Sequence, residues 1–226
     1  MPDLFLFYFA GLQYTERYWS LPHDERQQLA DNFSAELQAG LPHHALYQVF
    51  PARSETNLFL WSSFLATTPN QPAGIFETIA RLLIAHRPYL RPTNIKWGFT
   101  RPSDYSKAKS SQEINPLSSD HKKYLIVYPF TKTADWYRFG RDARQGMMNE
   151  HIWIGHQYPQ ISQLLFYSTD LQDQEFLVAY ETDELPSFSN LVSELRTSDA
   201  RSYILSDTPI YTAVHHPTQD TLNLFL

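Results

Sequence analysis

The chain has 226 residues, of which 42% are hydrophobic and 15% aromatic, so it can bury a large core, and general disorder is excluded. Its 18 basic and 24 acidic residues give a formal net charge of −6 without a Lys/Arg block, which argues against nucleic acid or an anionic membrane surface as a partner. A cysteine count of 0 excludes a disulfide scaffold, thiolate metal sites and cysteine catalysis.

The apolar runs of the sequence are shorter than the roughly 20 residues that a membrane helix needs. The N-terminus has no basic region in front of a short, Phe-rich run, so residues 4–9 are predicted to form a first strand and not a signal peptide. We therefore expect a cytoplasmic protein without a membrane partner.

The first half of the chain alternates between strand and helix patterns. Short aromatic-rich runs predict strands, whereas apolar residues at helical spacing, such as Leu29, Phe33 and Leu37, predict helices. In chain order the patterns predict a strand, a helix, two strands, a helix and a strand, at residues 4–9, 22–40, 45–50, 57–64, 72–86 and 95–100.

The second half repeats this order of elements. The equivalent predicted elements lie at residues 124–130, 134–156, 163–168, 175–181, 187–196 and 208–214. Equivalent strands are roughly 120 positions apart, so the repeat is one of element order. Two βαββαβ units predict an α+β fold of two ferredoxin-like halves of the dimeric αβ-barrel type, with antiparallel sheets packed face to face and helices outside.

A stretch rich in Ser, Lys and Pro, without apolar periodicity, separates the two halves. It predicts an N-terminal half at residues 1–101, a linker crossing the surface at residues 102–122, and a C-terminal half at residues 123–226.

The chemistry of the chain does not follow from common motifs. Glycine-loop, zincin and serine-hydrolase patterns are missing from a sequence with only 7 glycines. His151, however, shares a helix face with Met147 and Met148, the face that turns toward the sheet. An imidazole in such an apolar cleft suits an axial haem ligand, and the alternative is a core histidine bonded to a backbone carbonyl.

Two polar residues interrupt apolar strands of the second half. Alternation places Tyr128 on one face with Tyr124 and Ile126, where it is either a functional phenol or a cross-strand packing aromatic. Gln163 opens a strand on the face of Leu165, where its amide either bonds a ligand or lies at a hydrated strand end.

The second half also contains several longer runs, which are Tyr128-Pro129-Phe130-Thr131-Lys132, Asp135-Trp136-Tyr137, Met147-Met148-Asn149-Glu150-His151, residues 167–176 and residues 191–196. As a set, these runs resemble the chlorite dismutase/coproheme decarboxylase superfamily over about the last hundred residues. The first half agrees in element order, as the duplicated ferredoxin-like fold of that family implies.

The resemblance implies a haem-type iron porphyrin in the second half, with His151 as its metal ligand. Lys132 and an acid near Asp199 would support the imidazole. Trp136 and Met147 would line the cofactor cavity.

Two positions distinguish the activities within the family. Chlorite dismutases carry a distal arginine after the proximal histidine, whereas coproheme decarboxylases of the Firmicutes type carry a distal glutamine and a redox-active tyrosine in a Tyr-Pro motif. The matching residues here are Gln163 and Tyr128. Since the segment before Gln163 is one residue shorter than the family pattern, Leu164 is the alternative distal residue, and neither is an arginine.

The implied reaction makes coproheme both substrate and cofactor, with hydrogen peroxide as the oxidant and haem b as the product of haem biosynthesis. The oxidising equivalent passes to Tyr128, the tyrosyl radical takes a hydrogen from the β-carbon of a propionate, carbon dioxide leaves and a vinyl group remains. Arg196 would pair with a propionate, because a planar guanidinium matches a carboxylate. The family further implies a homo-oligomer, a pentamer.

Two alternatives stay open at this point. The first is a chlorite dismutase or haem peroxidase on the same scaffold. The second is a non-enzymatic haem-binding protein, or a duplicated αβ-barrel protein that binds a small apolar ligand.

Overall fold

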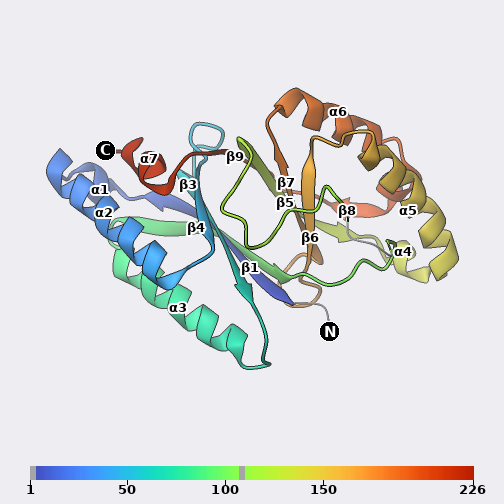
Figure 1. Ribbon diagram of the computed structural model, residues 1–226, viewed down its shortest axis with the longest axis horizontal. Helices are drawn as coiled ribbons and strands as arrows, with labels where there is room; N and C mark the ends of the chain where they lie inside the picture. Colours follow the sequence, from blue (N-terminus) through green and yellow to red (C-terminus); the bar gives the residue numbers. More distant parts are fainter. Residues whose placement is uncertain (1–3, 107–109) are drawn as a thin grey trace.

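The structure, a computed structural model, describes residues 4–106 and 110–226. Its two halves lie side by side, with helices on the outside of the strands (Figure 1). None of the helices in the described ranges is long and apolar enough to cross a membrane.

The elements follow the predicted order. Those of the first half are β1 (Phe5–Tyr14), α1 (Glu16–Trp19), α2 (His23–Gly40), β2 (His44–Gln48), β3 (Leu58–Leu65), α3 (Gln71–His86) and β4 (Leu90–Phe99). Those of the second half are β5 (Tyr124–Lys132), α4 (Ala134–Arg138), α5 (Arg141–His156), β6 (Ser162–Tyr167), β7 (Phe176–Thr182), α6 (Leu185–Leu195), the 3-10 helix η1 (Asp199–Tyr203), β8 (Ile204–Ser206), β9 (Tyr211–His215) and α7 (Thr218–Asn223).

Each half forms a four-stranded antiparallel sheet, in the order β4-β1-β3-β2 and β6-β7-β5-β9. The two sheets also join at both edges, because β2 pairs with β9 through Tyr47 and His215, and β4 pairs with β6 through Phe99 and Tyr167. Eight strands therefore close into a barrel, and β8 adds a short strand beside β5. The predicted fold class is confirmed.

The barrel explains why both faces of β1 are apolar from Phe5 to Leu12. Its alternate residues Phe7 and Phe9 fill the interior with side chains from the opposite sheet, such as Phe166 at 4.4 Å between ring centroids from Phe7. The residues between them, Leu6 and Tyr8, face the helices. Both faces are thus buried, and the polar alternation of a half-exposed strand is lost.

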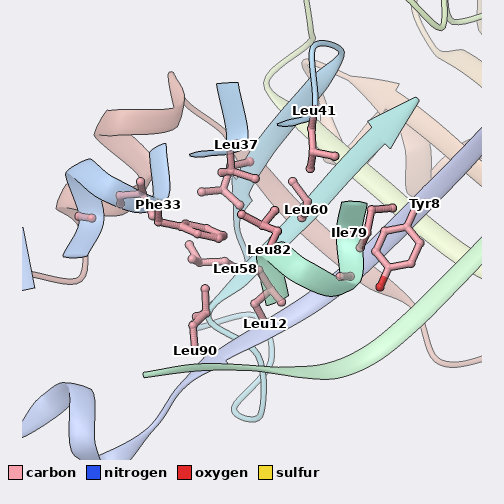
Figure 2. Packing of buried hydrophobic residues seen from close by; sticks show 14 of the residues in the cluster. Tyr8, Leu12, Phe33, Leu37, Leu41, Leu58, Leu60, Ile79, Leu82 and Leu90 are labelled. Atoms are coloured by element: carbon pink, nitrogen blue, oxygen red, sulfur yellow. The ribbon is translucent and has the colours of Figure 1, made fainter. Parts of the chain in front are cut away.

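The outer face of the first sheet is covered by α2 and α3. In Figure 2, Leu37 of α2 and Leu82 of α3 extend toward Leu58 and Leu60 of β3. These side chains are at most 7% exposed, so this helix–sheet layer is closely packed.

The outer face of the second sheet is filled less completely. Tyr128 and Phe130 on β5 are half-buried, whereas Leu6 and Tyr8 on β1 are 0% and 4% exposed. Of the 16 residues of α5, Ile154 is the one that is fully buried, although α3, also of 16 residues, buries four. Apolar surface thus remains between α5 and the second sheet.

Two predictions are corrected by the structure. The single helix expected at residues 134–156 is divided into α4 and α5, because Phe139 and Gly140 adopt extended backbone conformations. The expected surface linker enters the molecule at Gln112, which is 8% exposed, and at Ile114, which packs in the barrel interior.

Gly98 marks the close contact between β4 and β6. A methyl group on its Cα would lie 3.0 Å from the carbonyl oxygen of Tyr167 and 3.1 Å from the Cβ of Phe166. We expect Gly98→Ala to lower the free energy of unfolding by about 1–3 kcal/mol, measured by urea unfolding. Gly74→Ala in α3, where nothing lies within 4 Å, is the matched control and should raise it by up to about 1 kcal/mol. Equal free energies of unfolding for wild type and Gly98→Ala would contradict the close contact between β4 and β6.

Candidate active site

The candidate site lies between α5 and the outer face of the second sheet. Strand register places Tyr128, Val178 and Leu165 in one row across β5, β7 and β6. The next row contains Ile126, Tyr180 and Gln163. Because neighbouring strands are about 4.8 Å apart, Tyr128 and Gln163 border the same stretch of sheet surface from its two sides.

His151 reaches this space from α5 and is half-buried. Burial, and to a smaller extent the positive charge of Lys132, lower the pKa of its imidazole to about 4. Within the described chain, no hydrogen bond to a backbone carbonyl occupies the imidazole. The ring is therefore neutral near pH 7, with a nitrogen lone pair available for a ligand.

Lys132, at the end of β5, interacts with both His151 and Trp136: its charge affects the pKa of His151, and its side chain lies over the ring of Trp136. Its Nζ lies 4.1 Å from the ring centroid of Trp136 and 3.4 Å from the carbonyl oxygen of Ala200. Burial lowers the pKa of Lys132 to about 8, although the Glu175 carboxylate acts in the opposite direction. The backbone N–H of Lys132 also donates to Glu175 Oε2 at 2.7 Å. The structure thus brings together three of the predicted residues.

Tyr128 lies in a polar neighbourhood that the sequence did not reveal. Burial is the largest cause that raises the pKa of its phenol well above the usual value, followed by the effects of Tyr180, whose ring stacks on it, and of Asp207. Asp207 in turn accepts from Arg201 at 2.7 Å. No sequence motif marks Tyr180, Asp207 or Arg201. Strand pairing between β5 and β7 places Tyr180 beside Tyr128, and the segment that begins with η1 brings Arg201 and Asp207 near it.

The two candidates for the distal position point to opposite sides of β6. Gln163 shares the helix-facing side with Leu165, and it is exposed. Leu164 is 6% exposed and packs inside the barrel with Phe166. The placement of Leu164 contradicts its expected contact with a ligand beside His151, so Gln163 alone of the two faces the site.

The remaining predicted residues lie at the border of this region. Met147 is half-buried on α5, one turn before His151. Arg196 is exposed at the C-terminal end of α6. Asp199 is also exposed, and its backbone N–H donates to Glu150 Oε2 at 3.1 Å, whereas the acids near Lys132 and Tyr128 are the half-buried Glu175 and Asp207.

The residues present fit a flat apolar group with an anionic edge. Half-buried aromatic and thioether side chains provide apolar surface on both walls, and His151 provides a neutral donor. Two buried polar atoms nearby, Arg144 Nε on α5 and Thr133 Oγ1, have no hydrogen-bond partner in the described ranges. A buried guanidinium nitrogen without a partner is costly, so an acidic ligand group would satisfy it.

Comparisons with known proteins agree with this architecture. A family model described as chlorite dismutase matches residues 23–216. The coproheme decarboxylase of Mycolicibacterium smegmatis is 28% identical over 173 residues, covering 76% of this chain and 73% of that protein. The coproheme decarboxylase of Staphylococcus saprophyticus is 26% identical over 227 residues, covering 89% of this chain and 87% of that protein.

Chlorite dismutases are similar as well. That of Ideonella dechloratans is 25% identical over 113 residues, covering 47% of this chain and 40% of that protein. The solved structure of the chlorite dismutase from Candidatus Nitrospira defluvii in complex with imidazole has a TM-score of 0.82 at 20% identity, covering 98% of this chain and 94% of that chain. At this identity the structural similarity shows the shared fold.

Gln112 connects the two walls of the site. Its side-chain amide donates to the carbonyl oxygens of Gly155 at 3.3 Å, near the C-terminal end of α5, and of Tyr158 at 2.8 Å and Ile161 at 3.0 Å, in the segment that follows. The backbone carbonyl oxygen of Gln112 accepts a hydrogen bond from the backbone N–H of Gln163 at 2.7 Å. One residue of the linker therefore holds the end of the His151 helix against the strand that carries Gln163.

We expect Gln112→Ala to loosen this connection, because carbonyl oxygens at the end of α5 lose their donor. The free energy of unfolding should fall by about 2–3 kcal/mol in urea, and amide hydrogens at residues 155–163 should exchange faster. Gln174→Ala is the matched control, since Gln174 is another buried amide, 5% exposed, bonded to Ser168 at 3.3 Å. Unchanged exchange at residues 155–163 in Gln112→Ala would contradict the connection.

Proposed function

Because the chain belongs to the chlorite dismutase family, we propose that it is a peroxide-dependent coproheme decarboxylase, which converts two propionates of coproheme to the vinyl groups of haem b. The observation that carries the proposal is the sheet face shared by a half-buried tyrosine, Tyr128, and a glutamine, Gln163, opposite His151. None of the three strands β5, β6 and β7 contains an arginine. The two coproheme decarboxylases also match a larger share of this chain than the Ideonella chlorite dismutase does.

The second-half residues have distinct roles in this proposal. When bound, the iron porphyrin supplies the reaction of peroxide that produces oxidising equivalents. His151 would hold the iron through its neutral imidazole, Lys132 and Trp136 would support the wall behind it, and Met147 would line the porphyrin cavity. Gln163 positions peroxide by hydrogen bonding, and Arg196 or the unpaired Nε of Arg144 binds a propionate.

Tyr128 carries the radical step. It gives up the proton and one electron of its O–H bond, and the resulting tyrosyl takes a hydrogen atom from the β-carbon of a propionate. Loss of a second electron releases carbon dioxide and leaves the vinyl group. For each propionate, one hydrogen peroxide accepts the two electrons and becomes two waters. Burial keeps the phenol protonated, so the hydrogen atom is present at the start.

We further propose a homo-oligomer, a pentamer, as the family resemblance implies. Large apolar side chains remain exposed in the single chain, among them Trp153 at 63% and Leu205 at 70%. Such residues suit contacts with further copies of the chain.

The decisive experiment adds peroxide to the protein loaded with coproheme and follows the porphyrin by chromatography and mass spectrometry. We expect the loss of two carboxyl groups and the appearance of haem b. Tyr128→Phe should bind coproheme with unchanged affinity but form vinyl groups more than about a hundredfold more slowly. Tyr8→Phe, a buried phenol 120 residues earlier on β1, is the control and should behave as wild type. Normal haem b formation by Tyr128→Phe would remove the proposed role of this residue.

The same samples test the alternatives. Rapid oxygen release from added chlorite, without change of the porphyrin, would favour a chlorite dismutase. Binding of haem or coproheme without either reaction would favour a haem-binding protein without enzymatic activity.

Axial ligation has its own test in His151→Ala. The variant should lose the absorption spectrum of imidazole-bound iron porphyrin, and added imidazole should restore it, because the missing ring is then supplied from solution. His156→Ala is the matched control on the same helix, since His156 is exposed. An unchanged spectrum of His151→Ala would show that another residue binds the iron.

A further inference from the structure

Tyr180 is a buried phenol in the site that the proposed function does not use. It is 5% exposed on β7, and strand register places it between Ile126 of β5 and Gln163 of β6. The phenol of Tyr180 thus occupies the sheet surface that separates Tyr128 from Gln163.

The contact between Tyr128 and Tyr180 is close and well defined. Their ring centroids are 6.0 Å apart and the ring planes differ by 22°, so the two phenol rings are stacked, and each phenol affects the pKa of the other. On its other side, Tyr180 contacts the ring of Phe188 of α6 at 5.1 Å. Among the described residues, Tyr128 is the titratable side chain that acts on the pKa of Tyr180.

The two phenols differ in their surroundings. Tyr128 is half-buried and lies within the electrostatic influence of Asp207 and Arg201. Tyr180 is enclosed by apolar side chains, and burial raises its pKa, so it too keeps its proton. An oxidised Tyr180 would therefore be better shielded from water than an oxidised Tyr128.

We propose that Tyr180 is a second oxidisable residue of the site, which exchanges a hydrogen atom with the adjacent phenol of Tyr128. The inference rests on the proposed function, in which hydrogen peroxide is the oxidant and Tyr128 is oxidised first. In the exchange, the O–H bond of Tyr180 breaks and the O–H bond of Tyr128 forms, so one electron and one proton move together. No further oxidant is required. The pair holds the oxidising equivalent inside the protein until a propionate is in place.

The test places a radical trap at position 180. In Tyr180→3-aminotyrosine, whose ring is more easily oxidised than tyrosine, peroxide and coproheme should produce an aminotyrosyl radical detected by electron paramagnetic resonance. Tyr8→3-aminotyrosine is the matched control and should give none, because Tyr8 lies in the core of the first half. Adding Tyr128→Phe to the trap variant should abolish the radical at position 180.

Failure of the inference and failure of the proposed function are distinguishable in these samples. Conversion of coproheme without a radical at position 180 overturns the role of Tyr180 and leaves the proposed function standing. A wild-type protein that neither converts coproheme nor forms any tyrosyl radical overturns the proposed function itself.

A further measurement needs no porphyrin. Photo-oxidation of the unliganded protein with a ruthenium polypyridyl complex and persulfate should couple the two adjacent rings, each losing one hydrogen, and join the peptides that contain Tyr128 and Tyr180. The cross-link should be found by mass spectrometry in wild type and Tyr8→Phe, and be missing in Tyr180→Phe. Its absence from wild type, while both peptides carry other oxidation products, overturns the proposed pair.

Tyr180→Phe also separates this role from a merely structural one. We expect coproheme affinity to stay within about twofold of wild type and vinyl formation to slow by about tenfold, because the second oxidisable hydroxyl is lost while the ring is kept. Equal rates in wild type and Tyr180→Phe would overturn the inference, as would a loss that appears only in affinity.

Discussion

The structure depends on one constraint, which is that each sheet of the barrel has two apolar faces to remove from water. The inner faces of the two sheets bury one another, through rings such as Phe7 and Phe166 that contact each other inside the barrel. The outer faces depend on helices. In the first half α2 and α3 complete this burial, whereas α5 leaves Tyr128 and Phe130 half-buried. The candidate site is the part of the molecule in which the constraint is met incompletely.

Burial also explains the charge states in the site. It is the largest cause of the lowered pKa of His151, about 4, and of Lys132, about 8, and of the raised pKa of Tyr128. Near pH 7 the imidazole is therefore neutral and the phenol protonated, whereas Lys132 remains mostly cationic beside Glu175. A single physical effect thus produces a neutral imidazole with a free lone pair and a phenol that keeps its hydrogen atom.

The sequence predicted the features that depend on local periodicity. The duplicated element order and the face shared by Ile126 and Tyr128 follow from spacing alone, and the structure bears both out. The division of the long helix could not be predicted in this way, because apolar residues occur on both sides of Gly140, although the helical conformation is interrupted there. Tyr180 and Gln112 were missed for a different reason. They meet the site only through strand register and through a linker that returns to the end of α5, and neither contact leaves a trace in local spacing.

The duplication allows one comparison that separates fold from function. Tyr8 and Tyr128 lie 120 residues apart on the first strand of each half, and both face the helices. Tyr8 is 4% exposed beneath a helix that presents Ile75, Ile79 and Leu82. The helix opposite Tyr128 is α5, which brings His151. The same residue type at the same place in the fold is thus a core side chain in one half and a candidate radical site in the other. The difference lies in α5, which buries fewer apolar side chains against its sheet than α3 does. Each fully buried apolar side chain contributes roughly 1.5–3 kcal/mol to stability. A flat apolar ligand would restore that burial, so ligand binding and stability of the second half are thermodynamically linked.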